Sequence, residues 1–341
     1  MTAAPALPVP PLPYHRLLRA LPGYGWWKPL VALVITAVLW VVFTLVVVVV
    51  GVVIAASQGR VHFDSAARLT TELTALFGTV NAGDPLSISI ALIGVATLLP
   101  ATLLAYLMVG LRPLSVLRSV EFRIRWRWLA LCLLPALAIT FAATFVQFIL
   151  VPLFAGGGGP VAPTIPLGTF AVCAAIIVVF TPVQAAAEEF AFRGLTTQML
   201  GSWLRWAPFP IVLSAIPFAA SHTQYFGWAT AEVGFFALVA GFVTWRTGGL
   251  EAGIALHAVN NTVAFLTLAS SLGGATSTSA HDSGSWGSFL VTVITMGAYA
   301  YWIDRMARRR GIRNRLEPLA VAPAVPQREA APEPDAAAGN S

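Results

Sequence analysis

The chain has 341 residues, of which 57% are hydrophobic and only 10% are charged, and its mean hydropathy is +0.79. Soluble domains carry about 25% charged residues, so this composition excludes an ordinary soluble enzyme and indicates a multi-pass membrane protein. The length allows one helical bundle with tails, and no second folded domain is expected. Both cysteines, Cys132 and Cys173, lie in apolar stretches, which gives no support to a disulfide framework or a CxxC metal site.

Eight apolar stretches are about as long as the 20 or so residues that a helix needs to cross a bilayer. The predicted spans are 29–56, 86–110, 128–154, 168–194, 208–228, 231–246, 250–270 and 286–303. The first apolar run is far longer than the core of a signal peptide and lacks a clear cleavage site, so it is interpreted as a membrane helix. The predicted fold class is therefore all-α, a polytopic transmembrane bundle of about eight helices.

Basic residues occur in alternate connecting segments. They lie before the first predicted span, after the second, fourth and sixth, and after the eighth. Of the other connecting segments, 57–85 balances two arginines against three acidic residues, and 156–166 and 271–285 contain no Lys or Arg. Because basic loops stay on the cytoplasmic side, the pattern predicts a multi-pass protein of the cell membrane with both termini in the cytoplasm.

The ends of the chain differ in composition from its apolar middle. Residues 1–24 are rich in Pro and Ala, which predicts a disordered cytoplasmic tail. Residues 25–167 hold three predicted transmembrane helices with their loops, and 168–304 hold the remaining spans. Residues 305–341 begin with a basic stretch, expected to meet anionic lipid, and end in a Pro/Ala-rich disordered cytoplasmic tail. Lys28 is the only lysine, a usage typical of a GC-rich bacterial genome.

Two adjacent carboxylates, Glu188 and Glu189, lie within the fourth predicted span. Burying one carboxylate at the bilayer centre costs about 2.5–3.5 kcal/mol, so the two need a compensating interaction. Arg193 follows Glu189 by four residues and shares its helix face, which predicts an intramembrane ion pair. Glu188 then points roughly 100° away and is left to act as a base. The pair also has a purely structural interpretation, in which it fastens two helices together.

Two histidines lie in later spans, each with a partner on the same helix face. Phe218 and His222 are four residues apart in the fifth predicted span, and His257 and Asn261 are four apart in the seventh. Asn261 is placed to hydrogen-bond His257 or to polarise a substrate carbonyl. Each residue taken alone is more simply a packing residue or a helix–helix contact. Ionisable groups this sparse in a membrane should face one another, so the set together predicts one site.

The chain resembles the CPBP family in three motifs. They are Glu188-Glu189-x-x-x-Arg193, Phe218-x-x-x-His222 and His257-x-x-x-Asn261, in this order. That family comprises the type II CAAX prenyl endopeptidases and the bacterial Abi or bacteriocin-processing proteins, often called intramembrane metalloproteases. The resemblance covers about 180–265, and no motif position departs from the family pattern. It identifies 168–304 as a CPBP-like catalytic helical core.

The resemblance implies an intramembrane endopeptidase that hydrolyses a peptide bond with an activated water. The implied site comprises Glu188, Glu189, Arg193, His222, His257 and Asn261. Glu188 would activate the water with help from His222, as a desolvated carboxylate can do. His257 and Asn261 would stabilise the oxyanion, and donors of this kind act strongly in a dry cavity. The Glu189–Arg193 pair would orient the site.

Participation of a metal is left open. Glu188, His222 and His257 supply the nitrogen and oxygen ligands that a catalytic zinc site uses, whereas the family has also been interpreted as metal-independent glutamate proteases. The predicted cofactor is therefore either a divalent metal such as zinc, held by these three residues, or none. The expected partners are the lipid bilayer and a membrane-associated peptide or protein substrate, and no nucleic acid.

Two other functions are compatible with the same residues. The first is a non-catalytic immunity or scaffold protein of the same fold, which the intact motif set disfavours. The second is a proton-coupled transporter with Glu188 and the histidines as a relay, but the broken Gly-rich helices that favour transport are absent from the sequence. The HExxH, GxGD and GxSG motifs of other membrane proteases are absent as well. The substrate, the oligomeric state and the biological role, whether peptide maturation, toxin immunity or signalling, are not specified by the sequence.

Overall fold

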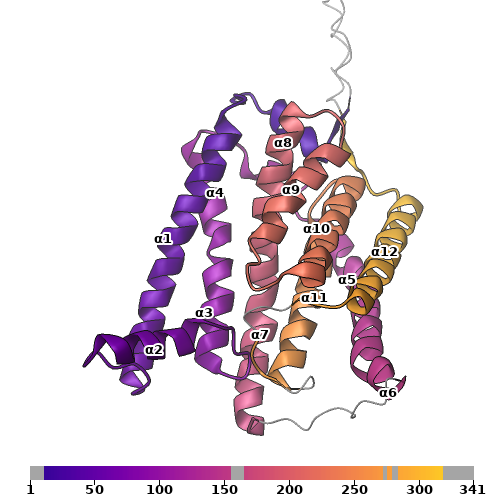
Figure 1. Ribbon diagram of the computed structural model, residues 1–341. Helices are drawn as coiled ribbons and strands as arrows, with labels where there is room; N and C mark the ends of the chain where they lie inside the picture. Colours follow the sequence, from indigo (N-terminus) through magenta and orange to yellow (C-terminus); the bar gives the residue numbers. More distant parts are fainter. Residues whose placement is uncertain (1–10, 155–164, 272–274, 279–282, 318–341) are drawn as a thin grey trace, which may run out of the picture.

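The computed structural model describes residues 11–154, 165–271, 275–278 and 283–317. Its elements in chain order are β1 (Leu12–Pro13), η1 (Tyr14–Ala20), α1 (Lys28–Ser57), α2 (Ala66–Phe77), α3 (Pro85–Ala96), α4 (Leu98–Met108), η2 (Leu114–Leu117), α5 (Trp126–Phe145), η3 (Val146–Leu150), α6 (Val151–Phe154), α7 (Leu167–Glu188), η4 (Glu189–Thr196), α8 (Thr197–Trp203), α9 (Pro208–Ala220), α10 (Gly227–Thr247), α11 (Glu251–Ala269), α12 (Trp286–Arg309) and β2 (Arg315–Leu316). Helices dominate this part of the chain, and the predicted all-α class is confirmed (Figure 1).

Within the described residues, seven helical stretches are long and apolar enough to cross a membrane. They are Lys28–Ser57, Pro85–Met108, Trp126–Leu150, Leu167–Trp203, Gly227–Thr247, Glu251–Ala269 and Trp286–Arg309. Each corresponds to one predicted span. The first, α1, measures about 45 Å at roughly 1.5 Å per residue, which is longer than the hydrocarbon core and leaves one end outside it. The multi-pass architecture follows from these seven.

The fifth predicted span, 208–228, is shorter than expected. α9 ends at Ala220 after 13 residues, which is about 20 Å of helix against a hydrocarbon core of about 30 Å. A turn over 221–226 follows, and Gly227 opens α10 with a φ of +59°, a conformation that favours glycine. The polar sequence His222-Thr223-Gln224 ends the helix that the apolar pattern predicted to continue.

The first and last described segments of the chain lie together at one end of the bundle (Figure 1). β1 pairs with β2 in an antiparallel two-stranded sheet. The side chains of Tyr14, Leu17 and Leu18 in η1 are fully buried, and the Tyr14 hydroxyl donates to the Leu117 carbonyl at 2.5 Å. The predicted disorder of 1–24 is therefore wrong for residues 11–24. The Pro/Ala-rich composition of this segment also includes Tyr14, Leu17 and Leu18, whose apolar side chains pack on the bundle.

The predicted disorder of the remaining tail residues falls on 1–10 and 318–341, which lie outside the described residues. The basic stretch after the last span is described as far as β2. Since β1 and β2 are paired, the N-terminal and C-terminal segments lie together at one end of the bundle.

α11 carries the third motif and lies in the interior of the bundle. It packs on α5 and α7, and on α10. Its first residue, Glu251, is fully buried and receives Arg125 Nε at 2.9 Å and Arg125 Nη2 at 2.6 Å. A side chain at Gly249 would collide with this pair, since its Cβ would lie 2.4 Å from Glu251 Oε2. The bidentate contact fixes the start of α11, six residues before His257.

Candidate active site

The first motif lies where the long helix Leu167–Trp203 changes its winding. α7 ends at Glu188, and η4 continues the helix from Glu189 as a π-helix. π-helical turns bond residues five apart, so residues four apart come almost directly one above the other. Arg193 Nη1 lies 2.9 Å from Glu189 Oε1, and the side chains are 2% and 0% exposed. The ion pair predicted from the spacing is confirmed.

Arg193 is held by groups from three helices. Its Nη2 donates to the Ala237 carbonyl on α10 at 3.2 Å, and its Cζ lies 4.4 Å from the centroid of the Phe218 ring on α9. Guanidinium groups over aromatic faces are attracted to the ring electrons, most strongly when desolvated. The arginine therefore joins η4 to α9 and α10 while neutralising Glu189.

His257 of α11 lies between the two glutamates. Its Nδ1 is 2.9 Å from Glu189 Oε1, and its Nε2 is 3.1 Å from Glu188 Oε2. A protonated His257 would, together with Arg193, balance the charge of the two carboxylates. A buried cluster without net charge avoids the large cost of an unpaired ion.

The two glutamates differ in accessibility. The Glu188 side chain is 11% exposed, whereas the Glu189 side chain is 0% exposed. Glu189 is also engaged by both Arg193 and His257, whereas Glu188 forms an ion pair only with His257 in the part of the chain that the structure describes. Glu188 is therefore the more exposed of the two carboxylates, and Glu189 is the one with the larger number of charged partners.

The second motif places its two residues in different surroundings. Phe218 is buried in α9, with its ring centroid 4.8 Å from that of His222 and 5.9 Å from that of His257. His222 was predicted within a membrane helix, but it lies in the turn after α9. Its Nδ1 lies 2.8 Å from the Phe218 carbonyl. Since a carbonyl only accepts, Nδ1 donates, and the Nε2 atom of this half-buried ring is left for other partners.

Asn261 bonds a residue that the motif search missed. Its Nδ2 donates to Gln184 Oε1 at 3.2 Å, so its partner is on α7 rather than His257 on its own helix. Gln184 is 5% exposed and lies one turn before Glu188. The sequence contained one signal for Gln184, since an amide four residues before an intramembrane carboxylate lies on the same helix face as that carboxylate. The Gln184–Asn261 contact joins the first and third motifs across the α7–α11 interface.

Gly253 is a second residue that sequence reasoning missed. A Cβ at this position would lie 2.8 Å from Glu189 Oε2 and 3.1 Å from Thr244 Oγ1. The absence of a side chain lets the Glu189 carboxylate lie against the backbone of α11. Gly253 and His257 are one turn apart on α11, so Glu189 approaches the helix at Gly253 and contacts the His257 side chain one turn later.

Gly253→Ala is expected to displace the Glu189 carboxylate and lower activity by about 10²-fold, as a shift of about 1 Å can do in an active site. Gly297→Ala is the matched control, because a Cβ on this α12 glycine meets no atom within 4 Å. Turnover of a peptide substrate by both variants, with their thermal unfolding, tests the expectation. Equal activity of the two variants would contradict the close approach at Gly253.

The predicted metal ligands are not gathered as a metal site. Within the described residues, no three His, Cys, Asp or Glu side chains are grouped so as to hold an ion. Both ring nitrogens of His257 are directed at carboxylate oxygens, whereas a metal-bound histidine gives one nitrogen to the ion. Within the described residues Glu188, His222 and His257 are therefore not arranged as three ligands of one ion, and the choice between a metal and no metal stays a prediction.

Comparison with known protein families gives one match. Residues 167–263 match the family described as type II CAAX prenyl endopeptidase Rce1-like. The matched segment begins at α7 and ends within α11, so it contains all three motifs and the whole charge cluster. No curated protein and no solved structure matched the chain. Residues 167–263 are therefore similar to the type II CAAX prenyl endopeptidase Rce1-like family, a family of proteases, as the three motifs predicted.

Proposed function

We propose that this protein is an intramembrane endopeptidase that hydrolyses a peptide bond in a membrane-anchored peptide or protein. The observation that carries the proposal is the buried cluster in which Arg193, Glu189 and His257 hold Glu188 in place while leaving it the more accessible carboxylate. The family match over the same residues supports a hydrolase.

In the proposed reaction Glu188 is the general base. It takes a proton from a water molecule as the water oxygen bonds to the carbon of the scissile carbonyl. The carbonyl oxygen becomes an oxyanion in a tetrahedral intermediate. When the C–N bond breaks, the proton held by Glu188 passes to the leaving nitrogen, and the products are a carboxylic acid and an amine. Glu188 returns to its starting state for the next cycle.

We assign stabilisation of the oxyanion to Asn261. The Asn261 amide has two N–H donors, and one of them is given to Gln184. His222 donates from Nδ1 to the Phe218 carbonyl, which leaves Nε2 of the neutral ring as an acceptor, so we assign His222 to helping Glu188 activate the water. His257, which the resemblance placed on the oxyanion, is engaged by both glutamates, so we assign it to positioning Glu188.

We further propose that the substrate enters from the lipid at the short helix α9. α9 ends at Ala220, before it has covered the thickness of a bilayer, and the turn 221–226 carries His222 at that position. Phe226 and Trp228 beside this turn are 52% and 43% exposed, as residues in contact with lipid can be. A membrane-anchored chain can therefore approach the site sideways. The face with both chain ends is the cytoplasmic one in this proposal.

The test uses the full chain in proteoliposomes sorted by accessibility of a C-terminal tag. A farnesylated peptide ending in a CAAX sequence and the same peptide without the lipid are supplied from either side. Cleavage, read as a shortened peptide by mass spectrometry, is expected for the lipidated peptide supplied on the side of the tag. Cleavage of neither peptide, or equal cleavage of both, would contradict the membrane-anchored substrate. Cleavage only from the opposite side would reverse the orientation.

A further inference from the structure

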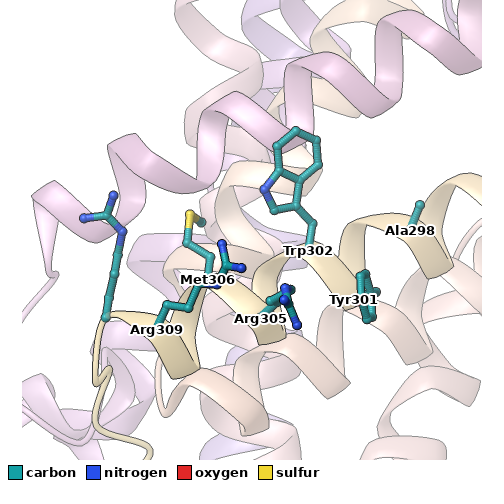
Figure 2. A pocket seen from close by; sticks show the side chains of 7 residues that line it. Ala298, Tyr301, Trp302, Arg305, Met306 and Arg309 are labelled. Carbon is teal, nitrogen blue, oxygen red and sulfur yellow. The ribbon is translucent and has the colours of Figure 1, made fainter.

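A groove on the outer surface of α12 lies outside the charge cluster. It is lined by Ala298, Tyr301, Trp302, Arg305, Met306, Arg309 and Arg310 and encloses about 560 Å³. Figure 2 shows the first six of these following one another along the helix. Another face of α12 packs on the bundle, where Tyr299 Oη donates to the Ala252 carbonyl of α11 at 2.8 Å. The groove therefore faces the surroundings of the bundle.

The arginines of the groove are not neutralised by the rest of the described chain. Arg305, Arg309 and Arg310 are exposed and form no ion pair with any residue that the structure describes. Their neighbours behave differently, because Arg308 and Arg246 both bind the Asp304 carboxylate. Three positive charges thus gather in one concave surface with no anion from the described protein to balance them.

Polarity rises along the groove in one direction. It starts at Ala298, passes the aromatic side chains of Tyr301 and Trp302, which are 67% and 45% exposed, and ends at the arginines. From Ala298 to Arg309 the helix rises about 16 Å, whereas the polar region of one leaflet is only about 5–7 Å thick. The groove therefore reaches from the headgroups into the hydrocarbon, with Trp and Tyr at the level where such rings accumulate.

We propose that this groove binds one anionic phospholipid. The arginines at the end of α12 receive the phosphate and the anionic headgroup, to which guanidinium forks are well suited. Trp302 and Ala298 contact the upper part of an acyl chain. The lipid is on the leaflet at the face where β1 and β2 join the chain ends, and its binding does not depend on the proposed protease activity.

The test is native mass spectrometry of the full chain in neutral detergent. The probes are phosphatidylglycerol, phosphatidylcholine with the same acyl chains, and inorganic phosphate. The variants are Arg305→Gln, Arg309→Gln and Arg310→Gln. Arg308→Gln is the matched control, since it removes the same charge from the same helix end but does not line the groove. We expect phosphatidylglycerol to bind more tightly than phosphatidylcholine.

Each groove variant is expected to bind phosphatidylglycerol about fivefold more weakly, the factor expected for one basic residue near an anionic lipid. Arg308→Gln is expected to bind like the unaltered chain. If Arg308→Gln weakened phosphatidylglycerol binding as much as the groove variants do, the lipid would be attracted by overall positive charge, and the proposed binding site in the groove would be wrong. Equal binding of the two lipids, or complete displacement of phosphatidylglycerol by inorganic phosphate, would contradict the proposal that the ligand is an anionic phospholipid. Trp302→Ala, which keeps every charge, should also weaken binding, and unchanged binding would remove the acyl-chain contact.

Discussion

Glu188→Gln is expected to abolish peptide hydrolysis while the protein still folds and inserts. The amide has the shape of the carboxylate but cannot take a proton from water, and general-base catalysis contributes about 10²–10⁴-fold to a rate. The assay is turnover of a lipidated peptide by purified protein, with thermal unfolding measured on the same sample. Because Glu188 is the partly exposed carboxylate of the cluster, stability should change less than activity.

Glu232→Gln is the matched control for this prediction. Glu232 is a carboxylate on the apolar helix α10, where it accepts hydrogen bonds from Ser288 at 2.6 Å and Thr292 at 3.2 Å, outside the charge cluster. It should retain activity. Substantial turnover by Glu188→Gln would remove this residue from the mechanism, and loss of activity in both variants would point to a general effect of carboxylates in these helices.

Arg193→Ala is expected to lower the free energy of unfolding by about 3–5 kcal/mol, because removing one member of a buried ion pair leaves the other charge uncompensated. The Arg193 side chain is 2% exposed, and the change also removes its contacts with the Ala237 carbonyl and the Phe218 ring. Activity should be lost as well, since Glu189 would no longer be held. Thermal and denaturant unfolding in detergent measure the effect.

A second variant separates charge from packing. Glu189→Gln combined with Arg193→Ala removes the stranded carboxylate, so it should unfold at a higher temperature than Arg193→Ala alone and still be inactive. Arg68→Ala is the control for an exposed pair, in which Arg68 binds Asp64 on the surface of α2, and it should melt close to the unaltered chain. If Arg193→Ala also melts like the unaltered chain, the structural role of the buried pair is wrong.

Features that depend on composition or on spacing along one helix were determined by the sequence. Apolar length located seven membrane spans, because a helix in lipid must satisfy its own backbone and needs a fixed number of residues to cross. The four-residue interval predicted the pair of Glu189 and Arg193, since neighbours on one helix face are set by helical geometry alone. The charge of the loops places both ends of the chain in the cytoplasm, and this orientation stays a prediction.

Contacts between helices were decided only by the tertiary structure. Asn261 was expected to bond His257 on its own helix or a substrate carbonyl, and the packing of α7 on α11 gives it Gln184 as a partner. Nothing in the spacing places His257 between two glutamates, or shows that Gly253 is needed where Glu189 meets α11. These contacts join residues far apart in the chain, and which of them meet depends on how whole helices pack. The end of α9 before His222 was missed for a related reason. Apolar length predicts how far a helix can continue, but it does not predict that α9 ends at Ala220 and is followed by a turn.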